Sequence, residues 1–226
     1  KRSGRIKLPS FYGTNVMIDF ENTKVLQELI RKYPGRVLDY LNSCNETQWL
    51  SKRWLAEKLN LYLYKHGKRD GSYNIALLGG WYGLLAHILI EELGVEIEQI
   101  DSFDIDYMTK KVGKILPLDK DIIKFHIQDI IEINFDDSYD IIINTSTEHM
   151  EQEIVNHTID TAVSGTMFVL QSNNFFDLQE HINCSESEEE FNDRYHWHFD
   201  EYVSLTKPWP TSMGDHERYM AFGIKK

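Results

Sequence analysis

The ten residues NIALLGGWYG, at positions 74–83, decide the fold. The first five form an apolar run of the length of a buried strand, and the glycines that follow let the chain turn tightly. From Trp81 to Leu93, leucine and isoleucine recur at a spacing of three to four, which predicts a helix. A strand, a glycine turn and a helix in this order are typical of the first unit of an α/β sheet.

The same alternation continues toward the C-terminus. Ile141-Ile142-Ile143 is typical of a strand that is covered on both faces. The last two predicted strands have no helix between them, so we expect them to close the sheet as an antiparallel hairpin. The sequence thus predicts an α/β fold with a mostly parallel seven-stranded sheet. Beyond residues 74–78, the strands are expected at 95–103, 122–127, 139–144, 166–171, 197–205 and 218–224, with helices at 107–115 and 151–162.

The first 72 residues show helical periodicity and no strand pattern. Residues 22–41 predict a helix interrupted at Pro34-Gly35, and residues 47–64 predict a second helix capped by Thr47. A polar break follows at 67–72. We therefore expect an N-terminal helical cap at 1–72 and the α/β domain at 73–226.

Charge is unevenly distributed between these two parts. The chain has 226 residues and a net charge of −12. Residues 1–72 hold 14 Lys and Arg against 7 Asp and Glu, a net of +7, and the remainder carries −19. The basic segment can contact an anionic partner such as nucleic acid, or it can pair with the acidic body. A body of −19 is a poor surface for duplex DNA, so a small or nucleotide-like substrate is favoured.

Composition excludes several classes of protein. The hydrophobic content of 42% rules out a disordered chain. No apolar run is long enough for a transmembrane helix, so no membrane association is expected. Cys44 and Cys184 form no framework for disulfides, which favours a reducing, cytoplasmic location. The acidic stretch 185–193 is interpreted as a solvated loop.

The glycine turn and two aspartates indicate a nucleotide site. The backbone at Gly79, Gly80, Trp81 and Gly83 can approach a ligand beside a helix N-terminus. Asp104 ends the second strand, 25 residues after Gly79, near the spacing at which a carboxylate accepts hydrogen bonds from both ribose hydroxyls. A strand-end cap is the alternative.

Asp129 follows the third strand. A carboxylate at this position can accept from the exocyclic amine of adenine, although aspartate is also a common turn and cap residue.

Together these features resemble the class I S-adenosylmethionine-dependent methyltransferases over residues 73–226. The resemblance implies a three-layer Rossmann-like fold with S-adenosylmethionine as cofactor, bound in part by Asp104-Ile105-Asp106 and Asn144. The family's first motif is an acidic residue followed by GxGxG, whereas this chain has Leu77 at the acidic place and Trp81 at the middle glycine.

Three strings narrow the resemblance to a little-characterised methyltransferase-like group carried by bacteriophages, which would put the protein in the host cytoplasm. They are GGWYG at 79–83, NTSTEH at 144–149 and QSNN at 171–174, and the group's segment before the glycine turn reads QWLSKRWL here, at 48–55.

The second polar cluster, at 144–149, points to the reacting groups. Glu148 and His149 could remove a proton from a methyl acceptor, or they could simply fill the first turn of the next helix. Lys52 could pair with the cofactor carboxylate, and a surface lysine is the alternative.

Missing motifs limit the reaction. No Asn/Asp-Pro-Pro-aromatic string stands after the fourth strand, which argues against methylation of exocyclic base amines. No Pro-Cys pair follows that strand either, which argues against methylation at cytosine C5, because that reaction needs a thiolate nucleophile. His196 and His198 would share one strand face. Spacing fixes no third ligand, although His181 and the acids at 188–190 are candidates, so we expect no metal centre.

The sequence thus predicts an S-adenosylmethionine-dependent methyltransferase of unknown acceptor and oligomeric state. The alternatives are another use of the cofactor (aminocarboxypropyl transfer or cofactor cleavage), an NAD-dependent oxidoreductase and a non-catalytic nucleotide-binding module.

Overall fold

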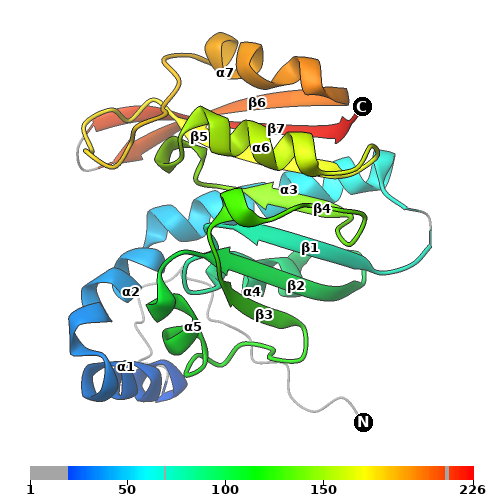
Figure 1. Cartoon of the computed structure of the whole chain (residues 1–226). Coiled ribbons are helices and arrows are strands. Elements are labelled where there is room, and N and C mark those ends of the chain that lie inside the picture. Colours follow the sequence, from blue (N-terminus) through cyan, green and yellow to red (C-terminus); the bar gives the residue numbers. More distant parts are fainter. Residues whose placement is uncertain (1–19, 69, 212–213) are drawn as a thin grey trace.

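The computed structural model describes residues 20–68, 70–211 and 214–226 and contains one seven-stranded sheet between helices (Figure 1). The strands are β1 (Tyr73–Leu78), β2 (Ile97–Asp104), β3 (Ile123–Ile127), β4 (Ile141–Asn144), β5 (Met167–Asn173), β6 (Phe199–Thr211) and β7 (Gly214–Lys225). The α-helices are α1 (Phe20–Lys32), α2 (Val37–Ser43), α3 (Glu46–His66), α4 (Leu84–Glu92), α5 (Tyr107–Gly113), α6 (Gln152–Thr161) and α7 (Glu188–Tyr195). Short 3-10 turns are η1 (Pro34–Arg36), η2 (Ile130–Glu132), η3 (Thr147–His149) and η4 (His196–His198).

The strand order is β3-β2-β1-β4-β5-β7-β6. The first five strands in this order are parallel, and β7 pairs antiparallel with both β5 and β6. The predicted Rossmann-like α/β sheet with an antiparallel C-terminal hairpin is confirmed. Because β1 lies between β2 and β4, the order reverses at the carboxyl end of β1, where open α/β sheets form a crevice for ligands.

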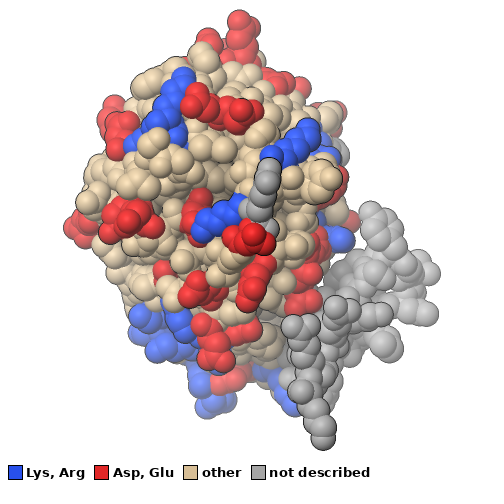
Figure 2. Space-filling model, turned by 90° about the vertical axis from the view of Figure 1, so that its right-hand side faces the viewer, with Lys and Arg blue, Asp and Glu red and all other residues tan. Residues whose placement is uncertain are grey.

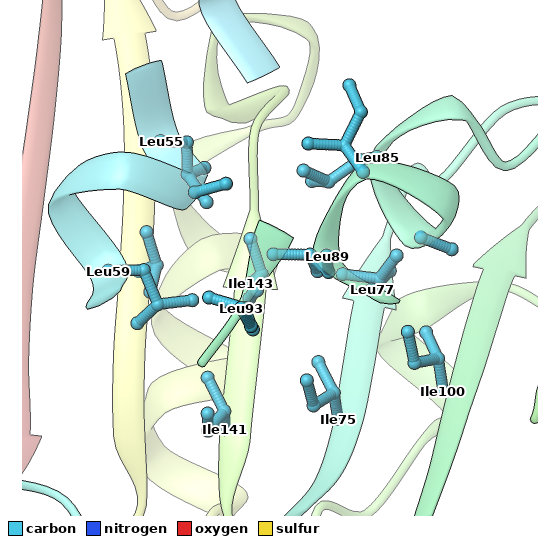
Figure 3. Close-up of a cluster of buried hydrophobic side chains, with 14 of the residues drawn as sticks. Leu55, Leu59, Ile75, Leu77, Leu85, Leu89, Leu93, Ile100, Ile141 and Ile143 are labelled. Atoms are coloured by element: carbon cyan, nitrogen blue, oxygen red, sulfur yellow. The ribbon is translucent and has the colours of Figure 1, made fainter. Parts of the chain in front are cut away.

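Alternation along the strands builds two apolar layers. Ile75 and Leu77 of β1 face α3 and α4, whereas Ala76 and Leu78 face the side that carries α6 and α7. Figure 3 shows the first layer, in which Leu55 and Leu59 of α3 and Leu85 and Leu89 of α4 meet the isoleucines of the strands. Burial of both faces explains the continuous apolar runs of the sequence.

The N-terminal helices join this body in two ways. Trp54, Leu55 and Leu59 place α3 in the same apolar core as the sheet. Val25 and Leu29 of α1 pack in a smaller cluster with side chains of α5 and of the turn after β1. In Figure 1, α1 and α2 lie near the end of the sheet where β1, β2 and β3 finish. The helical segment thus reaches the crevice.

Four local predictions were wrong. Residues 81–83 belong to the turn, so α4 begins at Leu84. The cap of α3 is Asn45, which accepts a hydrogen bond from the Gln48 N–H at 2.8 Å, and not Thr47. β6 begins only at Phe199, because η4 occupies residues 196–198.

The fourth error concerns the acidic stretch 185–193, most of which is helix. Ser187 caps α7 by accepting from the Glu190 N–H, and the glutamates lie in the first turn, where the helix dipole favours negative charge. Phe191 and Tyr195, one turn apart, are buried. No described helix is both long enough and apolar enough to cross a membrane.

Candidate functional site

A cleft of about 630 Å³ opens at the carboxyl ends of β1, β2, β3 and β4. The turn after β1, the loops after β2, β3 and β4, α3 and β7 all contribute to its lining. Ten of the twelve predicted site residues line it. They are Lys52, Gly79, Gly80, Trp81, Asp104, Ile105, Asp106, Asp129, Glu148 and His149.

The turn after β1 keeps a glycine-like backbone despite its tryptophan. Gly79, Trp81 and Gly83 have φ angles of +62°, +50° and +87°. The left-handed region costs a non-glycine residue about 1–2 kcal/mol, so Trp81 is strained. A Cβ at Gly80 would lie 2.0 Å from Ser102 Oγ and 3.2 Å from Ser102 Cβ, so a side chain there would displace the Ser102 hydroxyl. The turn therefore holds its backbone close to β2.

Asp104 binds this turn to the end of β2. Its carboxylate accepts from the N–H of Trp81 at 3.1 Å and from the N–H of Asp106 at 2.9 Å. Burial raises the pKa of Asp104 above its usual value, against these two hydrogen bonds, which lower it. Each carboxylate oxygen keeps a further lone pair, so Asp104 can accept from a ligand in the cleft as well.

Asp106 and Ile105 follow directly. The Asp106 side chain caps α5 by accepting from the Met108 N–H at 2.9 Å, and it pairs with Arg36 at 2.6 Å. Arg36 connects the N-terminal segment to the cleft, and the sequence analysis did not identify it. Ile105 leaves 73% of its surface exposed, which gives this wall of the cleft an apolar patch.

Asp129 lies across the cleft wall, after β3. Its side chain is exposed and accepts from the Ile131 N–H at 3.2 Å, so it caps η2. We call the part of the cleft formed by Gly79–Gly83, Asp104 and Asp129 the glycine end.

Gly83 and Asn144 are the two predicted residues that do not line the cleft. Gly83 is the N-cap residue of α4, where Phe125 and Leu118 leave no space for a Cβ. Asn144 is buried; its Oδ1 accepts from the Ser146 N–H at 3.0 Å and fixes the turn after β4. Both residues shape neighbouring backbone.

The other part of the cleft, the charged end, is formed by Lys52, Glu148, His149 and Arg218. Glu148 is only 3% exposed. Its Oε1 accepts from Asn173 Nδ2 at 2.7 Å, whereas its Oε2 is buried with no hydrogen-bond partner in the described part of the chain. The His149 ring is exposed beside it, and its Nδ1 lies 3.1 Å from the carbonyl oxygen of Glu180.

Lys52 reaches this end from α3. Its ammonium group donates to Gln48 Oε1 one turn earlier and is buried. Burial, and after it the charge of Arg218, lower the pKa of Lys52 to about 7. The alternative of a surface lysine is thereby wrong.

Arg218 begins the apolar part of β7 and was missed by the sequence analysis. Its Nε is buried with no hydrogen-bond partner among the described residues, and burial lowers its pKa. The charge of Glu148 opposes this lowering for both Arg218 and Lys52. The two cations therefore lie within electrostatic range of one buried carboxylate. A charged residue at the start of an apolar strand, next to Tyr219 and Met220, is the signal that could have identified Arg218.

The remaining candidates lie elsewhere. His196 and His198 belong to η4 and not to a strand, which removes the basis for the shared face that we expected. Cys184 is buried and free, and burial raises its pKa to about 11, as suits a packing residue.

The basic and acidic parts of the chain meet in ion pairs. Besides Arg36 and Asp106, Arg53 pairs with Glu92 at 2.6 Å and Lys68 with Asp140 at 2.5 Å. Figure 2 shows Lys and Arg interleaved with Asp and Glu on one face of the molecule. Residues 1–19 and 69 of the basic segment lie outside the described residues.

Comparison with known proteins identifies the fold. No family model and no curated protein matches the sequence. The structure is similar to magnesium protoporphyrin IX methyltransferase (ChlM) from Synechocystis PCC 6803, solved with bound S-adenosylmethionine, with 14% identity, 94% of this chain and 100% of that chain covered, and a TM-score of 0.57. It is also similar to the N-methyltransferase NodS from Bradyrhizobium japonicum WM9, in complex with S-adenosylhomocysteine, with 12% identity, coverage of 91% and 99%, and a TM-score of 0.58.

A third similar structure is described as a probable spermidine synthase from Corynebacterium glutamicum. The identity is 15%, the match covers 77% of this chain and 63% of that chain, and the TM-score is 0.57. At these identities the similarity shows a shared class I methyltransferase fold, which a synthase also uses. The comparisons give no support to the narrower resemblance to the phage-borne group.

Proposed function

We propose that the chain is an S-adenosylmethionine-dependent methyltransferase. The observation that carries this proposal is the glycine end: a left-handed turn after β1, held by the carboxylate of Asp104, at the reversal point of the sheet. The likeness to methyltransferases solved with this cofactor or its product supports the proposal.

The cofactor is assigned to both ends of the cleft. Asp104 accepts from the ribose hydroxyls and Asp129 from the adenine amine, while Ile105 packs against the base. Gly79, Gly80 and Trp81 border the middle of the cofactor. Lys52 receives the carboxylate of its methionine part, which relieves the cost of a buried ammonium group.

Three predicted residues support the site through the backbone. Gly83 begins α4 behind the turn, Asn144 shapes the loop after β4, and Asp106 links α5 to Arg36. They are positioning residues in this proposal.

The reaction takes place at the charged end. An acceptor lone pair attacks the methyl carbon, the carbon–sulfur bond breaks, and its electron pair stays on sulfur to give S-adenosylhomocysteine. The acceptor's proton passes to Glu148 or His149. In-line alignment of acceptor and methyl group is the main requirement of the protein.

The acceptor is proposed to be a small or nucleotide-like molecule. The net charge of −19 on residues 73–226 repels a long polyanion, and a cleft of about 630 Å³ has the size of a small-molecule site. RNA or DNA would have to bind through the basic segment at 1–72.

A thermal-shift titration with S-adenosylmethionine, S-adenosylhomocysteine and NAD tests the cofactor. A ligand at ~100 times its dissociation constant adds about 2.7 kcal/mol of stability, which raises the melting temperature of a chain of this size by several degrees. We expect shifts with the first two ligands. A shift with NAD alone would contradict the proposal and favour an oxidoreductase.

Product analysis tests the reaction. Methyl transfer converts the cofactor to S-adenosylhomocysteine, whereas aminocarboxypropyl transfer leaves methylthioadenosine. Methylthioadenosine as the main product with every acceptor mixture would reject methyl transfer and keep the cofactor.

A further inference from the structure

We propose that Glu148, His149 and His181 form a binding site for a divalent transition-metal ion at the charged end of the cleft. One ligand atom from each of the three side chains lies within 4.8 Å of the other two. The two imidazole rings pack edge to face with their centres 4.6 Å apart. This inference rests on the proposed function only in placing the methyl acceptor beside the ion.

Hydrogen bonds prepare both histidines for an ion. His149 Nδ1 lies 3.1 Å from the Glu180 carbonyl oxygen, and His181 Nδ1 lies 2.6 Å from that of Phe175. A carbonyl oxygen only accepts, so both Nδ1 atoms carry the proton and both Nε2 atoms keep a lone pair. Metal-binding histidines commonly donate their other N–H to a carbonyl or carboxylate in this way.

Glu148 is prepared in the same manner. Asn173 Nδ2 donates to its Oε1 at 2.7 Å and orients the carboxylate, while Oε2 is buried with no hydrogen-bond partner. A buried carboxylate oxygen without a partner is costly, and an ion bound to it removes that cost.

The ligand set selects the class of ion. Two imidazoles and one carboxylate suit Zn²⁺, Fe²⁺ or Co²⁺, whereas Mg²⁺ and Ca²⁺ prefer oxygen ligands. Three protein ligands leave coordination positions open, as in catalytic zinc sites. Glu148 and His149 line the cleft, so an open position there is accessible to an acceptor.

Arg218 sets the charge of that acceptor. It lines the cleft together with Glu148 and His149, and its guanidinium group would repel a bare divalent ion. An anionic oxygen on the ion offsets this repulsion, because it is attracted by both the ion and Arg218, whereas Lys52 is paired with the cofactor carboxylate. The site therefore favours an acceptor that carries a carboxylate, phosphate or ionised hydroxyl group.

With an ion bound, Glu148, His149 and His181 would serve as its ligands. The ion would supply Lewis-acid chemistry: it would lower the pKa of an acceptor hydroxyl so that the hydroxyl loses its proton to solvent, and the oxygen would then take the methyl group as the carbon–sulfur bond breaks.

The test is a titration of the untagged full chain with Co²⁺, followed by visible absorption, with competition by Zn²⁺. We expect one ion per chain, and binding at least ~10-fold weaker in His181→Ala and in Glu148→Gln. His196→Ala is the matched control, because it removes an exposed imidazole outside the cleft, and it should bind like the wild type. Circular dichroism checks that each variant is folded.

Equal Co²⁺ binding by the wild type and by folded His181→Ala and Glu148→Gln would overturn the site, as would no binding by the wild type. The outcome is separate from that of the proposed function, because S-adenosylhomocysteine binding is measured without metal. Absence of Co²⁺ binding by a wild-type chain that still binds S-adenosylhomocysteine would overturn the metal site and leave Glu148 and His149 as the proposed proton acceptors.

Discussion

At the glycine end of the cleft, Asp104 and Asp129 accept hydrogen bonds from backbone N–H groups, whereas at the charged end Lys52 and Arg218 lie within electrostatic range of one buried carboxylate, that of Glu148. The two aspartates therefore have backbone partners before any ligand arrives. The charged end holds a carboxylate oxygen and a guanidinium nitrogen that are buried with no hydrogen-bond partner among the described residues. The difference indicates that a bound ligand would change the electrostatic balance of the charged end more than that of the glycine end.

The largest effect that we expect is the pH dependence of stability that buried Lys52 causes, and its absence would contradict the difference between the two ends. Lys52 has a pKa of about 7 in the folded chain and near 10.5 when unfolded. Between these values the unfolded chain binds the additional proton, so the free energy of unfolding of the wild type rises with pH by up to about 5 kcal/mol from this group. The cost of burying the charged Lys52 destabilises the folded chain fully below pH 7, and this cost falls as the pH rises toward 10.

Denaturant unfolding of the wild type and Lys52→Met between pH 6 and 10 measures this effect. The gap between the two curves should narrow as pH rises, with the variant more stable at low pH. Parallel curves would mean that Lys52 is hydrated or paired, and that the two ends do not differ.

The second effect tests the rigid turn of the glycine end. A Cβ at Gly80 would lie 2.0 Å from Ser102 Oγ and 3.2 Å from Ser102 Cβ, so the Ser102 hydroxyl must move and Gly80→Ala should cost about 1–3 kcal/mol and lower the melting temperature by about 2–12 °C. Gly35→Ala is the control, because no atom lies within 4 Å of its added Cβ. A similar, small change in both variants would show that the turn yields easily.

The third effect sharpens the role of the charged end in binding. S-adenosylhomocysteine and 5′-methylthioadenosine differ in the part that carries the carboxylate. Lys52→Met should weaken the binding of S-adenosylhomocysteine by about 10- to 100-fold, which corresponds to the loss of one hydrogen bond to a charged group. The affinity for 5′-methylthioadenosine should stay unchanged. Calorimetry with both ligands measures this, and equal losses would place the carboxylate away from Lys52.

The smallest effect concerns backbone strain at Trp81. Trp81→Gly and Trp81→Ala both remove the ring, but only glycine adopts a φ of +50° freely. The glycine variant should be about 1 kcal/mol more stable than the alanine variant. The melting temperatures of the two variants measure this difference. A higher melting temperature for Trp81→Ala would mean that the turn relaxes around alanine.

The glycine end could be predicted because it is local. Strand, turn and carboxylate follow one another closely in the chain, and parallel strands bring their ends to one edge. Trp81 in place of glycine did not alter the turn, because Asp104 holds its N–H.

The charged end could be predicted only in part. Glu148, His149 and Lys52 were identified, and His181 was named only as a possible metal ligand beside His196 and His198. Arg36 and Arg218 reach the region through long-range packing that spacing does not encode. The α7 helix was missed because three glutamates were attributed to solvent, whereas Ser187 and the helix dipole explain them. Its boundaries depend on the buried Phe191 and Tyr195, which contact other elements.

Calorimetric titration with S-adenosylhomocysteine tests the cofactor assignment most directly. The wild type should bind, Asp104→Ala should bind about 10- to 100-fold more weakly, and Asp160→Ala, which removes an exposed carboxylate from α6, should match the wild type. Thermal unfolding of each variant confirms that the turn is intact. Equal affinity in a folded Asp104→Ala, or no binding by the wild type, would contradict a cleft built for S-adenosylmethionine.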